Sequence, residues 1–283
     1  SDLSSGVSMA EASMFADSLL IVAHPDDDIL WLGSVVDRVG GIIFCFNEDP
    51  GNPALGKARL KTIADYPLDN VATLRLIEPQ AWDKADWSRP SESASGIRLG
   101  NAQDEARYAE TFDKLLGMLR GRVASSRNIF THNPWGEYGH EEHVLVHRVL
   151  KTLQQEFRFD LWFSNYCSNR SATFMNRYIS GFGEAGERLP VNLQLVTEIA
   201  EIYKHNDCWT WYDDYRWFDS EWLRSEQADA EHKQVLPYGH SFPLNYIKIH
   251  VGSNRQRPTR AMRTLSRLKR RLQSTAFFSI NRE

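Results

Sequence analysis

The stretch SLLIVAHPDDD, residues 18–28, decides the fold predicted for this chain. Residues 18–23 form a short apolar run that predicts a buried strand, and a histidine, a proline and three aspartates follow it directly. Proline fits the first turn of a helix, and acidic side chains stabilise a helix N-terminus. A strand that turns straight into a helix is therefore expected here.

The residues beyond this stretch continue the alternation of strands and helices. Helical spacing over 28–39 ends at Gly40 and Gly41, and 42–46 predicts a second buried strand, which completes the strand–helix–strand unit of a parallel sheet. Further helices are expected over 54–66, 102–119, 140–157 and 193–205, and further strands over 71–77, 128–131, 160–165 and 246–251.

This alternation predicts a three-layer α/β/α sandwich with a mostly parallel, Rossmann-like sheet. In such sheets the ligand binds beyond the carboxyl ends of the strands, and His24 and His132 each follow a strand directly. We expect one α/β domain over 1–252, with its core in 18–165 and an aromatic-rich part in 166–252, followed by a basic amphipathic tail over 253–283.

The charge of the chain is unevenly distributed. The formal net charge is −4, but nine basic residues and one acid lie from Arg255 onward, which leaves 24 basic and 36 acidic residues before it. An acidic body argues against a nucleic-acid partner. The basic helix expected over 258–278 fits a peripheral contact with an anionic membrane or a lipid-linked glycan. An equally open alternative is that this helix docks on the acidic body of its own subunit or of a neighbouring subunit, in which case the protein would be an oligomer.

Several other classes are disfavoured by composition. The longest apolar runs fall far below the ~20 residues of a spanning helix, and residues 1–10 do not resemble a signal peptide, so we expect a cytoplasmic protein or one peripheral to the inner face of the membrane. Cys45, Cys167 and Cys208 are odd in number and widely spaced, which predicts neither a disulfide framework nor a cysteine zinc site.

Two clusters of histidines and carboxylates follow predicted strands. The first is His24 with Asp26, Asp27 and Asp28; the second, after the strand at 128–131, contains Tyr138, His140, Glu142 and His143. One such cluster alone is typical of a capped turn. Two of them at one sheet edge favour a metal site, because two histidines and a carboxylate with an open position form a catalytic zinc set.

A zincin is a poor alternative for the second cluster. That motif needs His-Glu-x-x-His on one helix, whereas Val144, Leu145 and Val146 separate His143 from His147. His147 lies one turn after His143, so it is a second candidate ligand, although we expect it to pack behind the site.

At these residues the sequence resembles a known family. Residues 23–27 (AHPDD) are similar to the AHPDD(E) signature of the PIG-L / LmbE-like zinc-dependent N-acetylglucosaminyl deacetylases, and 131–143 (THNPWGEYGHEEH) resembles that family's second signature, which ends in G-H-x-x-H. Residues 47–51 (NEDPG) are similar to the loop after the family's second strand. The resemblance covers residues 18–165 well and the rest poorly.

The resemblance implies a role for each residue of the two clusters. His24, Asp27 and His143 would hold one zinc ion per chain, and Asp26 would be the general base for the zinc-bound water. Tyr138 and His140 would stabilise the oxyanion or protonate the departing amine. Glu142 would orient His140 from behind.

The chain departs from the family pattern at three places. Asp28 stands where glutamate is commoner, Arg59 keeps the arginine of a short helical motif whose acid is replaced by Thr62, and the family's late histidine signature is only weakly echoed at His205. These departures concern the substrate rather than the chemistry.

The function that follows is a zinc-dependent de-N-acetylase, a hydrolase of linear amides, acting on an N-acetylhexosamine in a glycan or glycoconjugate. Tryptophans in 209–222, with Trp82, Trp87 and Trp135, offer faces for sugar stacking, or pack in the core. The alternatives are a metal-dependent hydrolase of another amide or ester, and a carbohydrate-binding protein with an inactive site.

Overall fold

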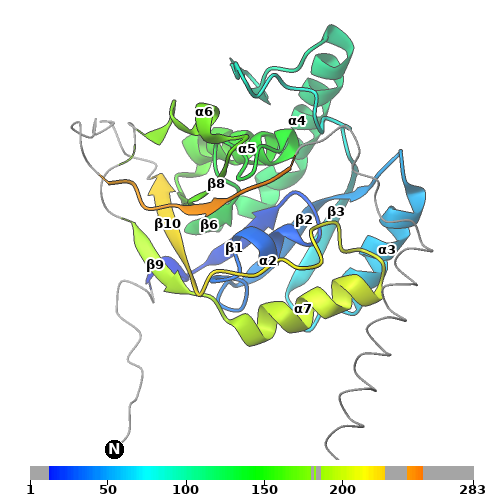
Figure 1. The fold of residues 1–283 in the computed structure, drawn as a ribbon, viewed down its shortest axis with the longest axis vertical. Helices are drawn as coiled ribbons and strands as arrows, with labels where there is room; N and C mark the ends of the chain where they lie inside the picture. The colour runs from blue at the N-terminus through cyan, green and yellow to red at the C-terminus, as the bar shows by residue number, and fades with distance from the viewer. Residues whose placement is uncertain (1–12, 180–181, 183–185, 227–240, 251–283) are drawn as a thin grey trace, which may run out of the picture. The chain divides into compact units, whose positions relative to one another are not determined.

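The computed structural model describes residues 13–179, 182, 186–226 and 241–250 (Figure 1). The main sheet that these residues form has seven strands in the order β3-β2-β1-β6-β7-β10-β9. Strands β3 to β7 of this order are parallel, and β10 runs antiparallel to both β7 and β9. The strands are β1 (Ser18–Val22), β2 (Gly41–Glu48), β3 (Val71–Ile77), β6 (Asn128–Thr131), β7 (Asp160–Ser164), β9 (Glu187–Pro190) and β10 (Ser220–Glu226).

Helices and two short strand pairs complete the described part. The helices are α2 (Asp27–Trp31), α3 (Pro53–Ala64), α4 (Ala102–Val123), α5 (Glu141–Phe157), α6 (Ala172–Met175) and α7 (Leu193–His205). The pairs are β4 (Glu92–Ser93) with β5 (Gly96–Ile97), and β8 (Tyr166–Ser168) with β11 (Asn245–Ile247).

The sheet separates two apolar cores. Leu20 and Val22 of β1 pack with residues of α2 and α7, whereas Ile21 and Ala23 pack with residues of α4 and α5. Successive side chains of a strand point to opposite faces, so an unbroken apolar run such as 18–23 fills both cores. The expected three-layer α/β/α fold with a mostly parallel sheet is confirmed.

Helix α2 is shorter than the sequence predicts. We expected a helix over 28–39, but α2 ends at Trp31. Gly33 and Ser34 donate their backbone N–H groups to the carboxylate of Glu221 at 3.2 and 3.0 Å. Glu221 lies on the distant strand β10, so a side chain far along the sequence stops the helix.

The remaining differences lie outside the two signature stretches. The region 82–100 contains the β4–β5 pair, which is not among the expected strands. The aromatic stretch 209–222 covers α2, where the Trp217 indole donates to the carbonyl of Ile29 at 2.6 Å. The described residues through Ile249 belong to one compact unit, and the predicted tail lies outside the described residues.

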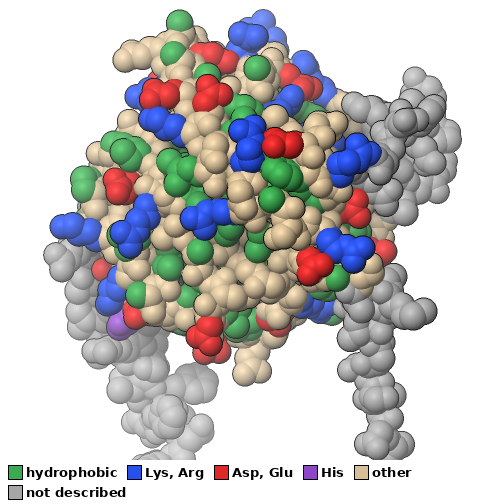
Figure 2. All heavy atoms as spheres, turned by 180° about the vertical axis from the view of Figure 1, so that it is seen from behind, with side chains coloured by type: hydrophobic (Ala, Val, Ile, Leu, Met, Phe, Trp, Pro, Cys, Tyr) green, Lys and Arg blue, Asp and Glu red, His purple; other side chains and the backbone are tan. Residues whose placement is uncertain are grey.

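Two further findings concern the helices and the surface of the described part. None of its helices is long and apolar enough to span a membrane. On the face seen in Figure 2, basic and acidic side chains are interspersed among apolar and neutral ones.

Candidate metal centre

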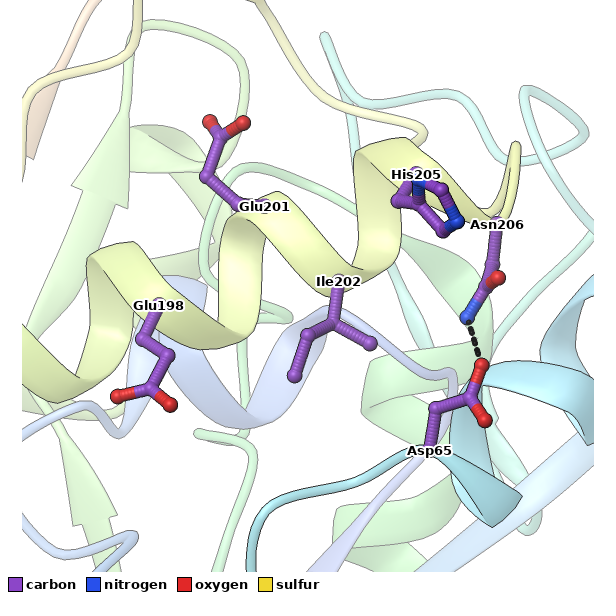
Figure 3. A pocket seen from close by; sticks show the side chains of 6 residues that line it. All are labelled: Asp65, Glu198, Glu201, Ile202, His205 and Asn206. Carbon is purple, nitrogen blue, oxygen red and sulfur yellow. Dashed lines mark hydrogen bonds between the residues drawn. The ribbon is translucent and has the colours of Figure 1, made fainter.

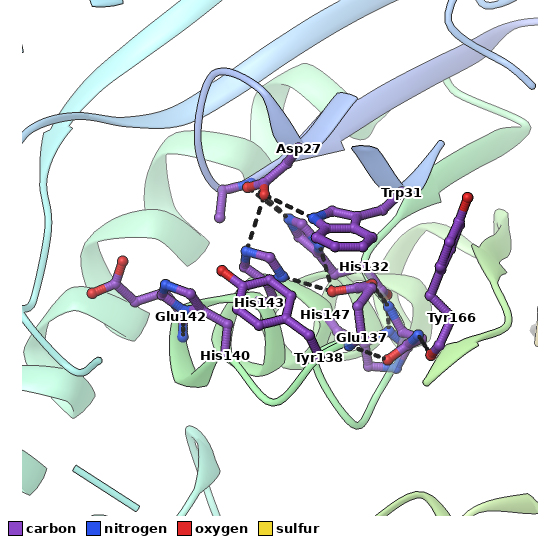
Figure 4. A network of polar contacts seen from close by, with 12 residues as sticks. Asp27, Trp31, His132, Glu137, Tyr138, His140, Glu142, His143, His147 and Tyr166 are labelled. Atoms are coloured by element: carbon purple, nitrogen blue, oxygen red, sulfur yellow. Dashed lines mark hydrogen bonds and ion pairs between the residues drawn. The ribbon is translucent and has the colours of Figure 1, made fainter. Parts of the chain in front are cut away.

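The two predicted clusters meet at one edge of the sheet. Strands β1 and β6 are parallel neighbours, and the first cluster follows β1 while the second follows β6 (Figures 1 and 4). Asp27 bridges them: its Oδ2 lies 3.2 Å from Nδ1 of His24, and its Oδ1 lies 3.2 Å from Nε2 of His143. The three residues expected to hold zinc are therefore brought together.

The turn after β1 is stabilised by its own aspartates. Asp27 accepts the backbone N–H of His24 at 2.7 Å and the indole N–H of Trp31 at 3.0 Å. Asp26 has φ 104°, an uncommon conformation for a residue with a side chain, and its N–H donates to Asp28 at 3.2 Å. Asp28 in turn accepts the hydroxyl groups of Tyr66 and Tyr203, so this acid supports the turn.

The turn after β6 depends on glycine. Gly136 has φ 66°, and a Cβ there would lie 2.5 Å from the carbonyl oxygen of His140. Gly139 has φ 92°, and a Cβ would meet the side chain of Arg170 at 2.8 Å. His140 then caps α5, because its Nδ1 accepts the N–H of Glu142 at 3.2 Å.

Three overlapping groups of buried or half-buried side chains in the described part could hold a metal ion. They are His24–His140–His143, Asp27–His132–His143 and His24–Glu78–Glu142. The set expected from the sequence, His24, Asp27 and His143, combines members of the first two groups. Hydrogen-bond direction separates the histidines that can bind a metal from those that cannot.

A backbone N–H can only donate, so it fixes the tautomer of the ring nitrogen that accepts it. The N–H of Ala23 donates to Nε2 of His132 at 2.8 Å, which occupies that lone pair. The backbone N–H of Glu142 likewise donates to Nδ1 of His140, so a neutral His140 carries its proton on Nε2. By contrast, Nε2 of the fully buried His143 receives no backbone N–H and lies 3.2 Å from Oδ1 of Asp27, so a metal ion could take the place of its proton.

Neighbouring charges move the pKa values of the first cluster in opposite directions. Burial, then the charge of Asp27, raises the pKa of Asp26 to about 7, against hydrogen bonds from Thr210. Burial opposes ionisation of Asp27 as well, but His143 and His24 hold the pKa of Asp27 well below its usual range. Of these two aspartates, Asp26 is therefore the one whose pKa lies near neutral pH, and Asp27 stays ionised.

The histidines of the site also differ in charge. Burial would lower the pKa of His24, but hydrogen bonds to Asp27 and Glu142 raise it to about 10. Burial and repulsion from His143 and His24 hold the pKa of His140 well below its usual range. His140 is therefore a neutral hydrogen-bond donor, while the carboxylates around His24 favour a cation.

One predicted contact is wrong. We expected the carboxylate of Glu142 to orient His140, but its Oε2 lies 2.7 Å from Nε2 of His24 and its Oε1 accepts the N–H of Ala81 at 3.1 Å. Glu142 lies in the first turn of α5, and its side chain reaches the turn after β1. Only its backbone N–H supports His140.

Tyr138 and His147 lie where the sequence predicts. The ring of Tyr138 is 5.7 Å from that of His140 and 5.4 Å from that of His143, between their centroids (Figure 4). His147 packs behind the site, where its Nδ1 lies 2.7 Å from the carbonyl oxygen of His132. It belongs to none of the three groups above.

The sequence did not indicate three further residues of the site. Glu137 accepts hydrogen bonds from His132 and His143. Thr210 donates to Asp26 from its backbone N–H at 3.0 Å and from its hydroxyl at 2.7 Å. The carboxylate of Glu78 lies 3.6 Å from Nε2 of His24. Thr210 comes from the aromatic stretch, far from Asp26 in sequence, so local spacing holds no signal for it.

The tryptophans divide into core and site residues. Trp87 and Trp135 are buried. The indole N–H of Trp87 donates to Glu141 at 2.9 Å, and that of Trp135 donates to the carbonyl of Tyr166 at 2.6 Å. Trp82 is half-buried, with its ring 4.8 Å from that of His140, and Trp211 lies 4.7 Å from Tyr138. This second pair contacts the site, as does Trp31 through its bond to Asp27.

A hollow of about 520 Å³ lies beside α7, and no residue of the two clusters is among those that line it (Figure 3). Its lining includes Asp65, Glu201 and His205, and Asn206 donates to Asp65 at 2.9 Å. His205, the weak echo of the family's late histidine, therefore lies outside the candidate metal centre.

Comparisons with known proteins do not assign a family. No family model matches the sequence, and no curated protein matches it. A crystal structure of a deacetylase–teicoplanin complex, from the biosynthesis pathway of teicoplanin, is similar with a TM-score of 0.49 and 10% identity, over 76% of this chain and 100% of that chain. At this similarity it assigns neither a family nor an activity, and the fold stands on the strand order.

Proposed function

We propose that the protein is a zinc-dependent de-N-acetylase that binds one ion through His24, Asp27 and His143. The observation that carries this proposal is the buried Nε2 of His143. It receives no backbone N–H and lies 3.2 Å from Asp27, which in turn contacts His24. Two histidines and one carboxylate are the donor set of catalytic zinc sites. His132 and His140 are excluded as ligands because backbone amides occupy their accepting nitrogens.

The chain's own residues supply the proton transfers. A bound divalent ion would polarise the acyl oxygen and acidify a water molecule. Asp26 is buried beside Asp27 and has a pKa of about 7, which suits a general base near neutral pH. Thr210 holds this carboxylate through two hydrogen bonds, so it is positioned before substrate arrives.

His140 and Tyr138 fit the opposite task, stabilisation of the developing oxyanion, and the departing amine would receive the proton that Asp26 takes from the water molecule. His140 is neutral, and its proton lies on Nε2 because the backbone N–H of Glu142 donates to Nδ1. A neutral imidazole N–H donates to an oxyanion without adding a positive charge beside His24 and His143. Tyr138 packs against the same two rings, His140 and His143.

The substrate proposed is an N-acetylhexosamine in a glycan or glycoconjugate, which would release acetate and a free amine. The resemblance of residues 23–27 and 131–143 to the deacetylase signatures supports this class. Half-buried Trp82 adds aromatic surface next to His140.

Mass spectrometry of a panel of N-acetylated glycans, before and after incubation with the full-length protein, tests the proposal. A loss of 42 mass units per acetyl group, about the mass difference between an acetamide and an amine, is the expected change. Metal-loaded protein that deacetylates no member of the panel, but hydrolyses other amides or esters, would contradict the proposed substrate class.

A further inference from the structure

Glu137 is a fully buried carboxylate in the turn between β6 and α5, bonded to two histidines. Its Oε2 lies 2.6 Å from Nδ1 of His143 and 3.1 Å from Nδ1 of His132, and its Oε1 accepts the N–H of Asn133 at 2.8 Å. Its backbone is fixed as well, since its N–H donates to Asn133 at 2.9 Å and its carbonyl accepts the Ser171 hydroxyl at 2.5 Å. The carboxylate therefore has one defined place.

This carboxylate determines which nitrogen each ring presents. An ionised carboxylate only accepts, so His132 and His143 both donate through Nδ1. The lone pair on Nε2 of His132 is then occupied by the N–H of Ala23. The Nε2 of His143 receives no backbone N–H and faces Asp27.

We propose that Glu137 is the positioning residue of the metal centre, which holds Nε2 of His143 toward the ion, and that His132 is its fixed, non-ligating partner. This inference rests on the proposed function, because it assumes that His143 binds the ion. A second carboxylate behind a ligating histidine fixes the orientation of the ring and strengthens it as a ligand. Asp27 lies before the ring of His143 and Glu137 behind it.

The role of His132 follows from its contacts on both sides. Its ring stacks on that of His143, with centroids 3.8 Å apart and an interplanar angle of 22°. Bonded to Ala23 and to Glu137, His132 prevents rotation of the neighbouring His143 ring. The competing arrangement, in which His132 is itself a ligand with Asp27 and His143, would require the bond from Ala23 to break.

A first experiment measures zinc affinity by chelator competition on full-length Glu137→Gln. The amide of glutamine is neutral, and its NH2 group would face either the N–H of Asn133 or the two Nδ1–H groups, so at least one hydrogen bond is lost and the affinity should fall about 10- to 100-fold. The matched control is Glu221→Gln, another fully buried carboxylate, which bonds Ser34 and Tyr166 and no proposed ligand. The control should keep the unmodified affinity, and equal losses in both variants would reduce Glu137 to a packing role.

A second experiment needs no variant and so does not depend on folding of a mutant. Protein labelled with ¹⁵N-histidine and loaded with ¹¹³Cd²⁺ should show coupling of the metal to Nε2 of His143, and none to His132, whose Nδ1 stays protonated. Coupling to His132, or to Nδ1 of His143, would overturn the inference and leave the proposed function intact. Absence of any Cd²⁺ or Zn²⁺ binding would overturn both.

Discussion

The turn after β1 and the turn after β6 carry the two halves of the candidate site, yet they are built differently. The first is held by side chains, because Asp27 and Asp28 accept backbone N–H groups within the turn itself. The second also uses a carboxylate, that of Glu137, but it depends on glycine as well, through Gly136 and Gly139 at positive φ. Both turns therefore combine structure and chemistry in the same carboxylates, and the second adds a backbone that only glycine adopts without strain.

The comparison extends to the adjacent aspartates of the first turn. Asp26 accepts hydrogen bonds from Thr210, and burial with the charge of Asp27 raises its pKa to about 7. Asp27 contacts histidines, which keep it ionised. Groups whose surroundings push their pKa values apart take different roles in acid–base chemistry. Substitutions in the two turns should accordingly separate metal binding, proton transfer and stability.

The largest effect is expected for His143→Ala. This change removes a proposed ligand, so bound zinc and acetate release should be lost together. The control is His147→Ala, one helical turn away and equally buried, which should keep zinc and cost about 1–3 kcal/mol of unfolding free energy. Metal analysis and thermal unfolding of both variants check this, and loss of zinc in His147→Ala would redraw the ligand set.

Asp26→Asn should abolish most turnover while zinc stays bound. Asparagine tolerates the left-handed backbone at this position, so the turn should survive, while a general base is worth about 10²- to 10⁴-fold in rate. The measurement is kcat together with zinc content. A variant that loses its zinc would show that Asp26, and not only Asp27, is a ligand.

Gly136→Ala should destabilise the second turn by about 1–3 kcal/mol or more, since a Cβ would lie 2.5 Å from the carbonyl of His140 at a positive φ. The control is Gly117→Ala in α4, where nothing lies within 4 Å of the added carbon, and which should stabilise by about 0.5–1 kcal/mol. Denaturant unfolding measures both. Equal stabilities for the two variants would mean that backbone conformation does not hold this turn.

Thr210→Val should have the smallest effect. It removes one of the two hydrogen bonds to Asp26 and keeps the one from the backbone N–H, so the carboxylate should stay in place. Because the lost bond favours the ionised form, the pKa of Asp26 should rise and the acid limb of the pH–rate profile should move to higher pH. A shift to lower pH would contradict the assignment of Asp26 as the base.

Local patterns predicted most of the sheet and the positions of both clusters. The bounds of β3 and β6 agree with the expected strands 71–77 and 128–131, because short apolar runs between turn residues mark buried strands. The convergence of the clusters followed from the rule that ligands bind at the carboxyl ends of parallel strands.

What the sequence could not predict depends on contacts between distant residues. Helix α2 ends early because Glu221 accepts two of its following N–H groups, and Asp26 is held by Thr210. The antiparallel strand β10, which carries Glu221, was not expected either. In the sequence Glu137 lies between His132 and Tyr138, but only the folded turn places its carboxylate behind the ring of His143.

The central claim is that one ion, held between the two turns, is required for hydrolysis of an N-acetyl group. The most direct measurement is acetate release from N-acetylglucosamine conjugates by one batch of full-length protein, before chelation, after chelation and after return of one equivalent of zinc. The account predicts activity that disappears with the metal and returns at one ion per chain. Acetate release that persists in metal-free protein would contradict it.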